Sequence, residues 1–169
     1  MKHLKTLVIA VVIAVGSMSF ANAQTKVAHI FVDQLMAEMP EMKAAEAELQ
    51  KLGKSYEADI RSTFQELQNK AQLYENEAAS KTDQENAKRA QEIQGMQANI
   101  QQAQQVAAQE IEKKKMELLE PILRKVNDVI QKVGRDKGFN YVLDASSGSG
   151  IILAEGTDIT ADVKAALGF

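Results

Sequence analysis

The sequence predicts a mainly α-helical protein with a small β part, in which a long antiparallel helical hairpin is inserted into a small α/β body. The first observation is that residues 41–133 consist largely of the helix formers Ala, Glu, Gln, Lys and Leu, with no proline before Pro121. The second is one interruption of this stretch, where Thr82 followed by Glu85 has the pattern of a capping box, which marks a new helix start. The third is that β-branched segments lie only at the two ends of the exported chain.

The hairpin is predicted over residues 41–117, with its turn near residues 80–84. At 1.5 Å per residue, a helix of about 40 residues is roughly 60 Å long, which is more than a compact domain of this size needs. Apolar residues recur on both helices in steps of three and four, which gives each helix one narrow apolar stripe. The stripes are Leu49, Leu52, Tyr56, Ile60, Phe64, Leu67, Ala71, Tyr74 and Ala78, followed by Ala87, Ala90, Ile93, Met96, Ile100, Ala103, Ala107 and Ile111.

Residues 1–23 have the pattern of a signal peptide. Two lysines precede an apolar run over residues 7–15, and an Ala-Asn-Ala cleavage site ends at Ala23, so cleavage is predicted before Gln24. Retention as a membrane anchor is the alternative, and it is disfavoured because glycine and serine at residues 16–19 interrupt a run that would need about 20 apolar residues.

Charge and cysteine content exclude several classes of protein. The formal net charge is −3 at pH 7, and loss of the two lysines with residues 1–23 makes it about −5. An acidic chain has no global attraction to nucleic acid, so no nucleic-acid partner is expected. Without cysteine, the exported chain has neither a lipidation site nor a disulfide, and its stability must come from packing.

The body is predicted to comprise residues 24–40 and 118–169. Three short strands are expected over residues 26–33, 139–144 and 151–154, because these segments are rich in β-branched and aromatic residues. From Leu118 to Val133 the apolar residues are spaced so that they form a broad apolar face of a helix. This predicts a helical base that packs against the strands.

Short helices are predicted at both ends of the body. Asp33 is the expected cap of a helix over residues 34–39, and Thr160 is the expected cap of the closing helix, with Leu167 as its inner contact. Pro40 suits the first position of the ascending helix, where its missing N–H is no loss. Two hinges are predicted in the descending helix, at Gly95, which lowers helix propensity, and at Pro121, which removes a hydrogen bond.

Self-association is expected because the body is too small to be comfortably stable alone. About 80 residues without disulfides or metal bury little surface, and the predicted strands have open edges that invite pairing. The candidates for the oligomer core are the apolar strand residues Ile30, Val32, Tyr141, Leu143 and Ile152.

Residues 93–109 of the descending helix contain no charge and seven glutamines. Two interpretations stay open: a solvated coiled coil with ordinary glutamine usage, or a neutral and adaptable surface for weak apolar contacts. The lysines at 113–115 are interpreted as a solvated face in preference to a binding patch.

Four segments resemble the Skp/OmpH-like periplasmic chaperones, and the likeness extends over the whole exported chain. The segments are Met-Pro-Glu at 39–41, Pro-Ile-Leu at 121–123, Lys-Gly-Phe-Asn-Tyr-Val-Leu-Asp at 137–144 and Asp-Ile-Thr-Ala-Asp-Val at 158–163. The resemblance implies a homotrimer, in which strands of three subunits form a small barrel-like core and three hairpins, or tentacles, surround a cavity. It also implies a periplasmic chaperone that holds unfolded outer-membrane proteins without ATP.

Members of this family that are best known for such work are basic and attract anionic lipid and lipopolysaccharide. This chain is acidic, so no lipopolysaccharide-binding residues are assigned, and any proximity to the membrane would be transient.

No residue pattern predicts an enzyme, a cofactor or a metal site. His29 is the one histidine of residues 24–169 and is interpreted as a core or interface residue, because no cysteine or second histidine could join it as a ligand. The glycine-rich segment at 146–150 has no following lysine, as a phosphate loop would.

Two functional hypotheses follow. In the first, the protein is a holdase whose arms make many weak contacts with an unfolded client through Phe64, Tyr74, Ile93, Met96, Ile100 and Val106. In the second, it is a non-catalytic structural or adaptor coiled coil of the cell envelope.

Overall fold

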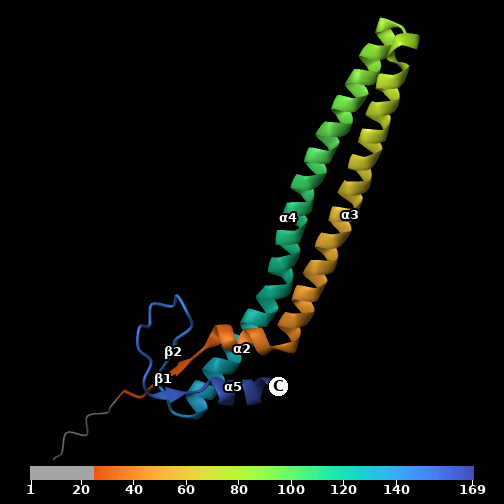
Figure 1. Cartoon of the computed structure of the whole chain (residues 1–169). Helices are drawn as coiled ribbons and strands as arrows, with labels where there is room; N and C mark the ends of the chain where they lie inside the picture. The colour runs from red at the N-terminus through yellow and green to blue at the C-terminus, as the bar shows by residue number, and fades with distance from the viewer. Residues whose placement is uncertain (1–24) are drawn as a thin grey trace, which may run out of the picture.

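The structure, a computed structural model, describes residues 25–169, so the predicted cleavage site at Ala23 and Gln24 lies outside the described residues. Figure 1 shows a small α/β body from which two long helices project side by side as one arm. The mainly helical fold with a small β part is therefore confirmed. The elements are β1 (Val27–Ile30), α2 (Val32–Glu38), α3 (Pro40–Glu77), a 3₁₀ helix (Ala78–Ser80), α4 (Asp83–Asp136), β2 (Tyr141–Asp144), β3 (Thr157–Asp158) and α5 (Thr160–Leu167).

The tip of the arm contains the capping box that its sequence predicts. Thr82 Oγ1 accepts a hydrogen bond from the Glu85 backbone N–H at 3.2 Å, and a Glu85 carboxylate oxygen accepts one from the Thr82 N–H at 2.9 Å. At the other end of the arm, Pro40 occupies the first turn of α3, also as predicted. The helix α4 continues through Pro121 without a break.

The sheet is a parallel one with β1 between β2 and β3. In β1, Ala28 and Ile30 are buried, whereas Val27 is exposed, so alternate residues face opposite sides of the sheet. The register pairs Val27 with Tyr141 and His29 with Leu143. The outer face of the sheet therefore presents the side chains of Val27, Tyr141 and Leu143 to solvent.

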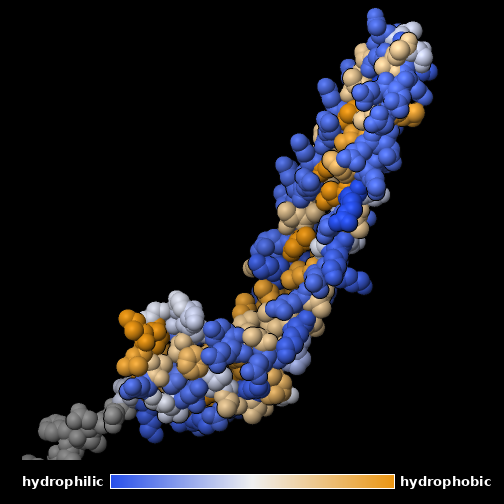
Figure 2. Space-filling model, viewed as in Figure 1, coloured by the Kyte–Doolittle hydropathy of each residue, from blue (hydrophilic) through white to orange (hydrophobic). Residues whose placement is uncertain are grey.

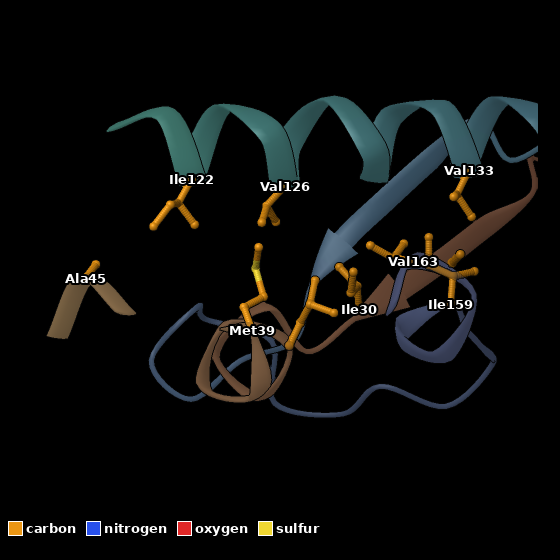
Figure 3. Close-up of a cluster of buried hydrophobic side chains, with 10 residues drawn as sticks. Ile30, Met39, Ala45, Ile122, Val126, Val133, Ile159 and Val163 are labelled. Carbon is orange, nitrogen blue, oxygen red and sulfur yellow. The ribbon is translucent and has the colours of Figure 1, made fainter. Parts of the chain in front are cut away.

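The core fills the space between the inner face of the sheet, the lower part of α4 and the two short helices. Figure 3 shows that Met39, at the junction of α2 and α3, points toward Val126 of α4, while Ile159 and Val163 approach from the α5 side. The buried cluster comprises Ala28, Ile30, Leu35, Met39, Ala45, Ile122, Val126, Val133, Ile159 and Val163.

The third strand is not where the sequence predicted it. Residues 151–154 form a loop, and β3 is a two-residue strand at Thr157–Asp158. Gly148, Gly150 and Gly156 all have positive φ, so the backbone turns on both sides of the predicted strand. Ile152, predicted to lie in the oligomer core, is a fully exposed loop residue in this chain.

The predicted caps of the two short helices are wrong, and the predicted cap residues instead make hydrogen bonds to distant parts of the chain. Asp33 lies inside α2, which begins at Val32, so Val32 is not a strand residue either. The N–H of Asp33 donates to Ser146 Oγ at 3.0 Å, which ties the start of α2 to the segment after β2. Thr160 is the first residue of α5 rather than its cap, and its Oγ1 accepts a hydrogen bond from the Phe31 N–H at 3.1 Å.

Two carboxylates at strand ends are expected to make the body sensitive to acid. Burial would raise the pKa of Asp144 and Asp158, but hydrogen bonds from Ser146 to Asp144 and from Thr160 to Asp158 outweigh it and lower both pKa values. Because the folded-state pKa is lowered, this stabilisation is present above the unfolded pKa of about 3.9 and is lost as pH falls through the folded pKa.

We expect Asp144→Asn to lower the free energy of unfolding at pH 7 by about 1 kcal/mol, the scale of hydrogen bonds to a partly exposed charged group. The variant should then lose less stability than the wild type between pH 7 and pH 3, as measured by urea unfolding followed by circular dichroism. Equal losses in the two proteins would show that Asp144 does not contribute to the acid sensitivity.

Candidate functional site

The predicted client contacts differ in how far they are exposed on the arm. Leu67 of α3 and Ile100 and Ala107 of α4 are buried in the seam between the helices. Ile100, one of the predicted client contacts, is therefore a seam residue and only 7% exposed, and its contact with a client stays a prediction. Phe64 and Val106 are exposed, and Tyr74, Ile93 and Met96 are half-buried.

A groove of about 490 Å³ runs between the two helices on one side of the lower arm. We call it the lower groove. Its α4 wall consists of Ile100, Gln104, Ala107, Ala108 and Ile111, all uncharged, and its α3 wall consists of Gly53, Tyr56, Glu57, Ile60, Arg61 and Phe64. The two charged residues of the α3 wall, Glu57 and Arg61, pair with each other one helical turn apart. The lower groove is thus apolar at its floor and close to neutral at its rim.

A second groove of about 560 Å³, the upper groove, lies nearer the tip. Its lining residues are Ala71, Tyr74 and Glu75 from α3, Ala78 from the 3₁₀ helix that follows, and Asn86, Arg89, Ala90, Ile93, Gln94 and Gln97 from α4. The Arg89 guanidinium lies 4.5 Å from the centre of the Tyr74 ring and donates to Glu77 at 2.6 Å. This stacked and paired arginine forms part of the wall of the upper groove.

The two grooves lie on the same side of the arm. On α3 the lining residues Glu57, Phe64 and Ala71 follow one another in steps of seven residues, which brings each to the same face of the helix. Figure 2 shows apolar side chains along the seam from the base of the arm toward its tip, with hydrophilic side chains on both flanks.

The other side of the seam is charged. A hollow of about 550 Å³ there shares Tyr56 with the lower groove but is otherwise lined mostly by Glu48, Lys51, Glu110, Lys113, Lys114 and Glu117. Lys114 pairs with Glu48 across the helices at 2.8 Å, and Lys115 pairs with Glu112 at 3.5 Å. These pairings are consistent with the interpretation of lysines 113–115 as a solvated face.

Glu92 joins the two helices below the tip. Its carboxylate accepts hydrogen bonds from Lys70 and from the Tyr74 hydroxyl, the latter at 2.6 Å. The bond from Lys70, followed by the bond from Tyr74, lowers the pKa of Glu92, and the same carboxylate raises the pKa of the Tyr74 hydroxyl. At neutral pH the carboxylate is therefore charged and holds both donors.

Gly95 is expected to weaken the arm locally. The packing around it does not require a glycine at this position. No described atom outside its immediate surroundings lies within 4 Å of an added Cβ. We expect Gly95→Ala to stabilise the upper arm by about 1 kcal/mol, because alanine has the higher helix propensity. Hydrogen exchange of the amides around residue 95 should slow accordingly.

Gly134 provides the control for Gly95, since it lies in the same helix. An added Cβ there would lie 2.8 Å from Cγ2 of Val142, so the Val142 side chain or β2 would have to shift. Gly134→Ala should therefore not stabilise the protein. Equal stabilisation by the two substitutions would contradict this explanation.

The candidates for the oligomer core also differ in exposure. Tyr141 and Leu143 are 61% and 41% exposed on the outer face of the sheet, where a partner could cover them. Ile30 is buried in the core of its own chain, and its place in a core between subunits stays a prediction. Figure 2 shows an apolar patch on the body beside the loop that follows β2, and this loop exposes Ile152 and Leu153.

Residues 25–169 contain no group of three or more His, Cys, Asp and Glu side chains that could hold a metal ion. Within the same residues, no helix is both long enough and apolar enough to cross a membrane. His29 is half-buried, and its ring packs edge-on against Phe31 with 5.5 Å between the ring centres.

The sequence analysis did not single out the groove glutamines Gln94, Gln97 and Gln104. The glutamine content of residues 93–109 was the available signal, but it did not distinguish the glutamines that face the groove from those that face away. That distinction requires the position of α3 beside α4.

Comparisons with known proteins agree with this architecture. The family model described as Outer membrane protein (OmpH-like) matches residues 26–167. The Chaperone protein Skp of Pectobacterium atrosepticum is 22% identical over 142 residues, which cover 84% of this chain and 85% of that protein. The Chaperone protein Skp of Photorhabdus luminescens is 23% identical over 151 residues, or 89% of this chain and 90% of that protein.

A solved structure of an OmpH-like protein from Caulobacter crescentus has the same fold. Its TM-score is 0.76 at 22% sequence identity, and the match covers 86% of this chain and 85% of that one. Because the family model matches nearly all the described residues, the chain belongs to the OmpH-like outer membrane protein family.

Proposed function

We propose that the protein is a periplasmic, ATP-independent holdase chaperone that binds unfolded outer-membrane proteins between its arms and prevents their aggregation. The observation that supports this proposal best is the slender arm with an apolar groove open to solvent. Two Skp chaperones are similar over most of this chain, which favours the same class of activity.

The proposed assembly is a homotrimer joined through the sheets, in a barrel-like core. The exposed outer face with Tyr141 and Leu143, and the open edges of β2 and β3, favour association of this kind. Copies joined at the body would hold their arms around a shared space. Each arm would bind weakly, and the total affinity would come from the number of arms that contact one client.

Client release in this proposal needs no nucleotide. An outer-membrane protein withdraws its apolar strands from the grooves as it folds into the membrane. The chaperone approaches the membrane only transiently, since its acidic charge gives no attraction to anionic lipid.

Aggregation of a urea-diluted outer-membrane β-barrel protein, followed by light scattering, tests the proposal. A holdase keeps the client soluble, whereas a structural or adaptor coiled coil of the envelope leaves the scattering unchanged. The proposal fails if the wild-type protein at equimolar trimer has no effect.

The comparison of Phe64→Ala with Leu73→Ala tests the groove side of the arm. Phe64 is 48% exposed and lines the lower groove, whereas Leu73 is 51% exposed on the same helix and lines neither groove. We expect Phe64→Ala to weaken client binding about tenfold, since a partly buried phenylalanine contributes about 1–2 kcal/mol to binding. Leu73→Ala should bind as the wild type does, and equal losses would contradict a binding role for the grooved side.

A further inference from the structure

We infer that the lower and upper grooves together bind one extended segment of an unfolded polypeptide per arm, and that glutamines of α4 recognise its backbone. This inference rests on the proposed function and deepens it, because it names the part of the client that is bound and the chemistry that binds it. The occupant is a neutral, extended segment with alternating apolar and polar side chains.

The length of the groove fits such a segment. On α4 the lining residues run from Ile111 to Asn86, which is about 37 Å at 1.5 Å per residue. An extended chain rises about 3.4 Å per residue, so about eleven residues would fill the groove. A transmembrane β-strand has about 9–11 residues. The lower and upper grooves together therefore match one strand of the proposed clients.

The chemistry of the groove fits a peptide backbone. Gln94, Gln97 and Gln104 are exposed residues that line it. Each glutamine side chain offers an acceptor oxygen and two N–H donors, which complement the N–H and C=O groups of a peptide unit. These side chains would satisfy the backbone groups of an extended chain that has no partner strand.

The arrangement of the two walls fits the alternation of side chains. The opposite wall presents Ile60 and Phe64, so one row of client side chains can pack on an apolar surface. Successive side chains of an extended chain point to opposite sides, and the other row would therefore point to water. Transmembrane β-strands have this alternation of apolar and polar residues.

The charges favour this occupant over a charged one. The α4 wall of the lower groove is uncharged, and the facing charges of Glu57 and Arg61 are already paired. In the upper groove Arg89 is paired with Glu77, and the other charged lining residue is Glu75. The cross-helix pairs of Glu48 with Lys114 and of Glu92 with Lys70 belong to residues that line neither groove. Binding of the segment should accordingly depend little on salt concentration.

The test compares two triple variants of the full protein. The groove variant is Gln94→Met, Gln97→Met and Gln104→Met. The control variant is Gln102→Met, Gln105→Met and Gln109→Met, which changes exposed glutamines of the same helix outside the groove lining. Methionine has a similar length and helix propensity, so both variants should keep the arm and its charge.

The probes are two fluorescent eleven-residue peptides with alternating valine and serine, one unmodified and one with N-methyl groups on every second backbone nitrogen. Binding is measured by fluorescence anisotropy. We expect the wild type and the control variant to bind the unmodified peptide about tenfold more tightly than the methylated one, and the groove variant to bind the two peptides equally. If the groove variant discriminates as well as the wild type, glutamines do not recognise the backbone and the inference is overturned.

Two further outcomes separate this inference from the proposed function. If the wild type keeps an outer-membrane protein soluble but does not bind the unmodified peptide, the inference fails and the holdase proposal stands. Sedimentation of the proteins without peptide provides the second separation. A changed oligomeric mass in the groove variant alone would show that the groove contacts a second copy of the chain, which also overturns the inference.

Discussion

Met39→Ala is expected to destabilise the body by about 2–5 kcal/mol, the range for truncation of a large buried side chain to alanine. Met39 is completely buried where α2 meets α3, and its side chain points toward Val126 of α4 (Figure 3). Truncation leaves a cavity among three elements that cannot all close on it. Because a domain of this kind has about 5–15 kcal/mol of stability in total, a large fraction would be lost.

Urea unfolding at pH 7 measures this effect, and Met116→Ala provides the matched control. Met116 lies on α4 but is 58% exposed, so its truncation should change the free energy of unfolding by less than about 0.5 kcal/mol. If the two variants unfold at the same urea concentration, Met39 does not hold the base of the arm to the body.

The arm depends on the body because it has little core of its own. Its seam buries Leu67, Ile100 and Ala107, and the next layer is only half-buried. The groove exists for the same reason, since a hairpin of two helices lacks a third element to cover the seam. The exposed apolar surface that limits the stability of the arm is also the surface available to a client.

The arm was predictable because local sequence determines it. Helix propensity, the capping box at Thr82 and Glu85 and the proline at the start of α3 act within a few residues, and the structure contains all three features. The half-buried and buried residues Tyr56, Leu67 and Ile100 follow the predicted spacing of three and four.

The body was less predictable because its elements are fixed by contacts between the two ends of the chain. The start of α2 is bound by Ser146, which is 113 residues away, so the local signal at Asp33 did not determine the cap. The third strand is determined by pairing with β1 and not by local propensity. Residues 157–158 pair with β1, whereas the β-branched run at 151–154 lies outside the sheet.

The candidate site was predictable in composition but not in position. Phe64 and Val106 are both exposed apolar residues of the arm, yet only Phe64 lines a groove. The side of the arm on which a residue lies depends on how α3 and α4 face each other, and the period of one helix does not contain that information.

Leu143→Asp is expected to convert the proposed trimer into monomers and to abolish protection of the client. Leu143 lies on the outer face of the sheet beside Tyr141 and opposite His29, where a carboxylate would be buried without a partner if another subunit covered this face. An unpaired buried charge costs several kcal/mol, which is enough to dissociate a small interface. Within a single chain the same side chain is exposed, so the variant should keep the helical content of the wild type.

Analytical ultracentrifugation and circular dichroism separate these two effects, and Leu123→Asp is the control. Leu123 is similarly exposed, at 49%, but it lies on α4 and not on the outer face of the sheet, so a carboxylate there should leave the mass of the assembly unchanged. A Leu143→Asp protein that remains trimeric would place the interface elsewhere on the body. A monomeric variant that still keeps a client soluble at equal arm concentration would show that one arm suffices. The affinity gained when several arms bind one client would then not be needed for protection.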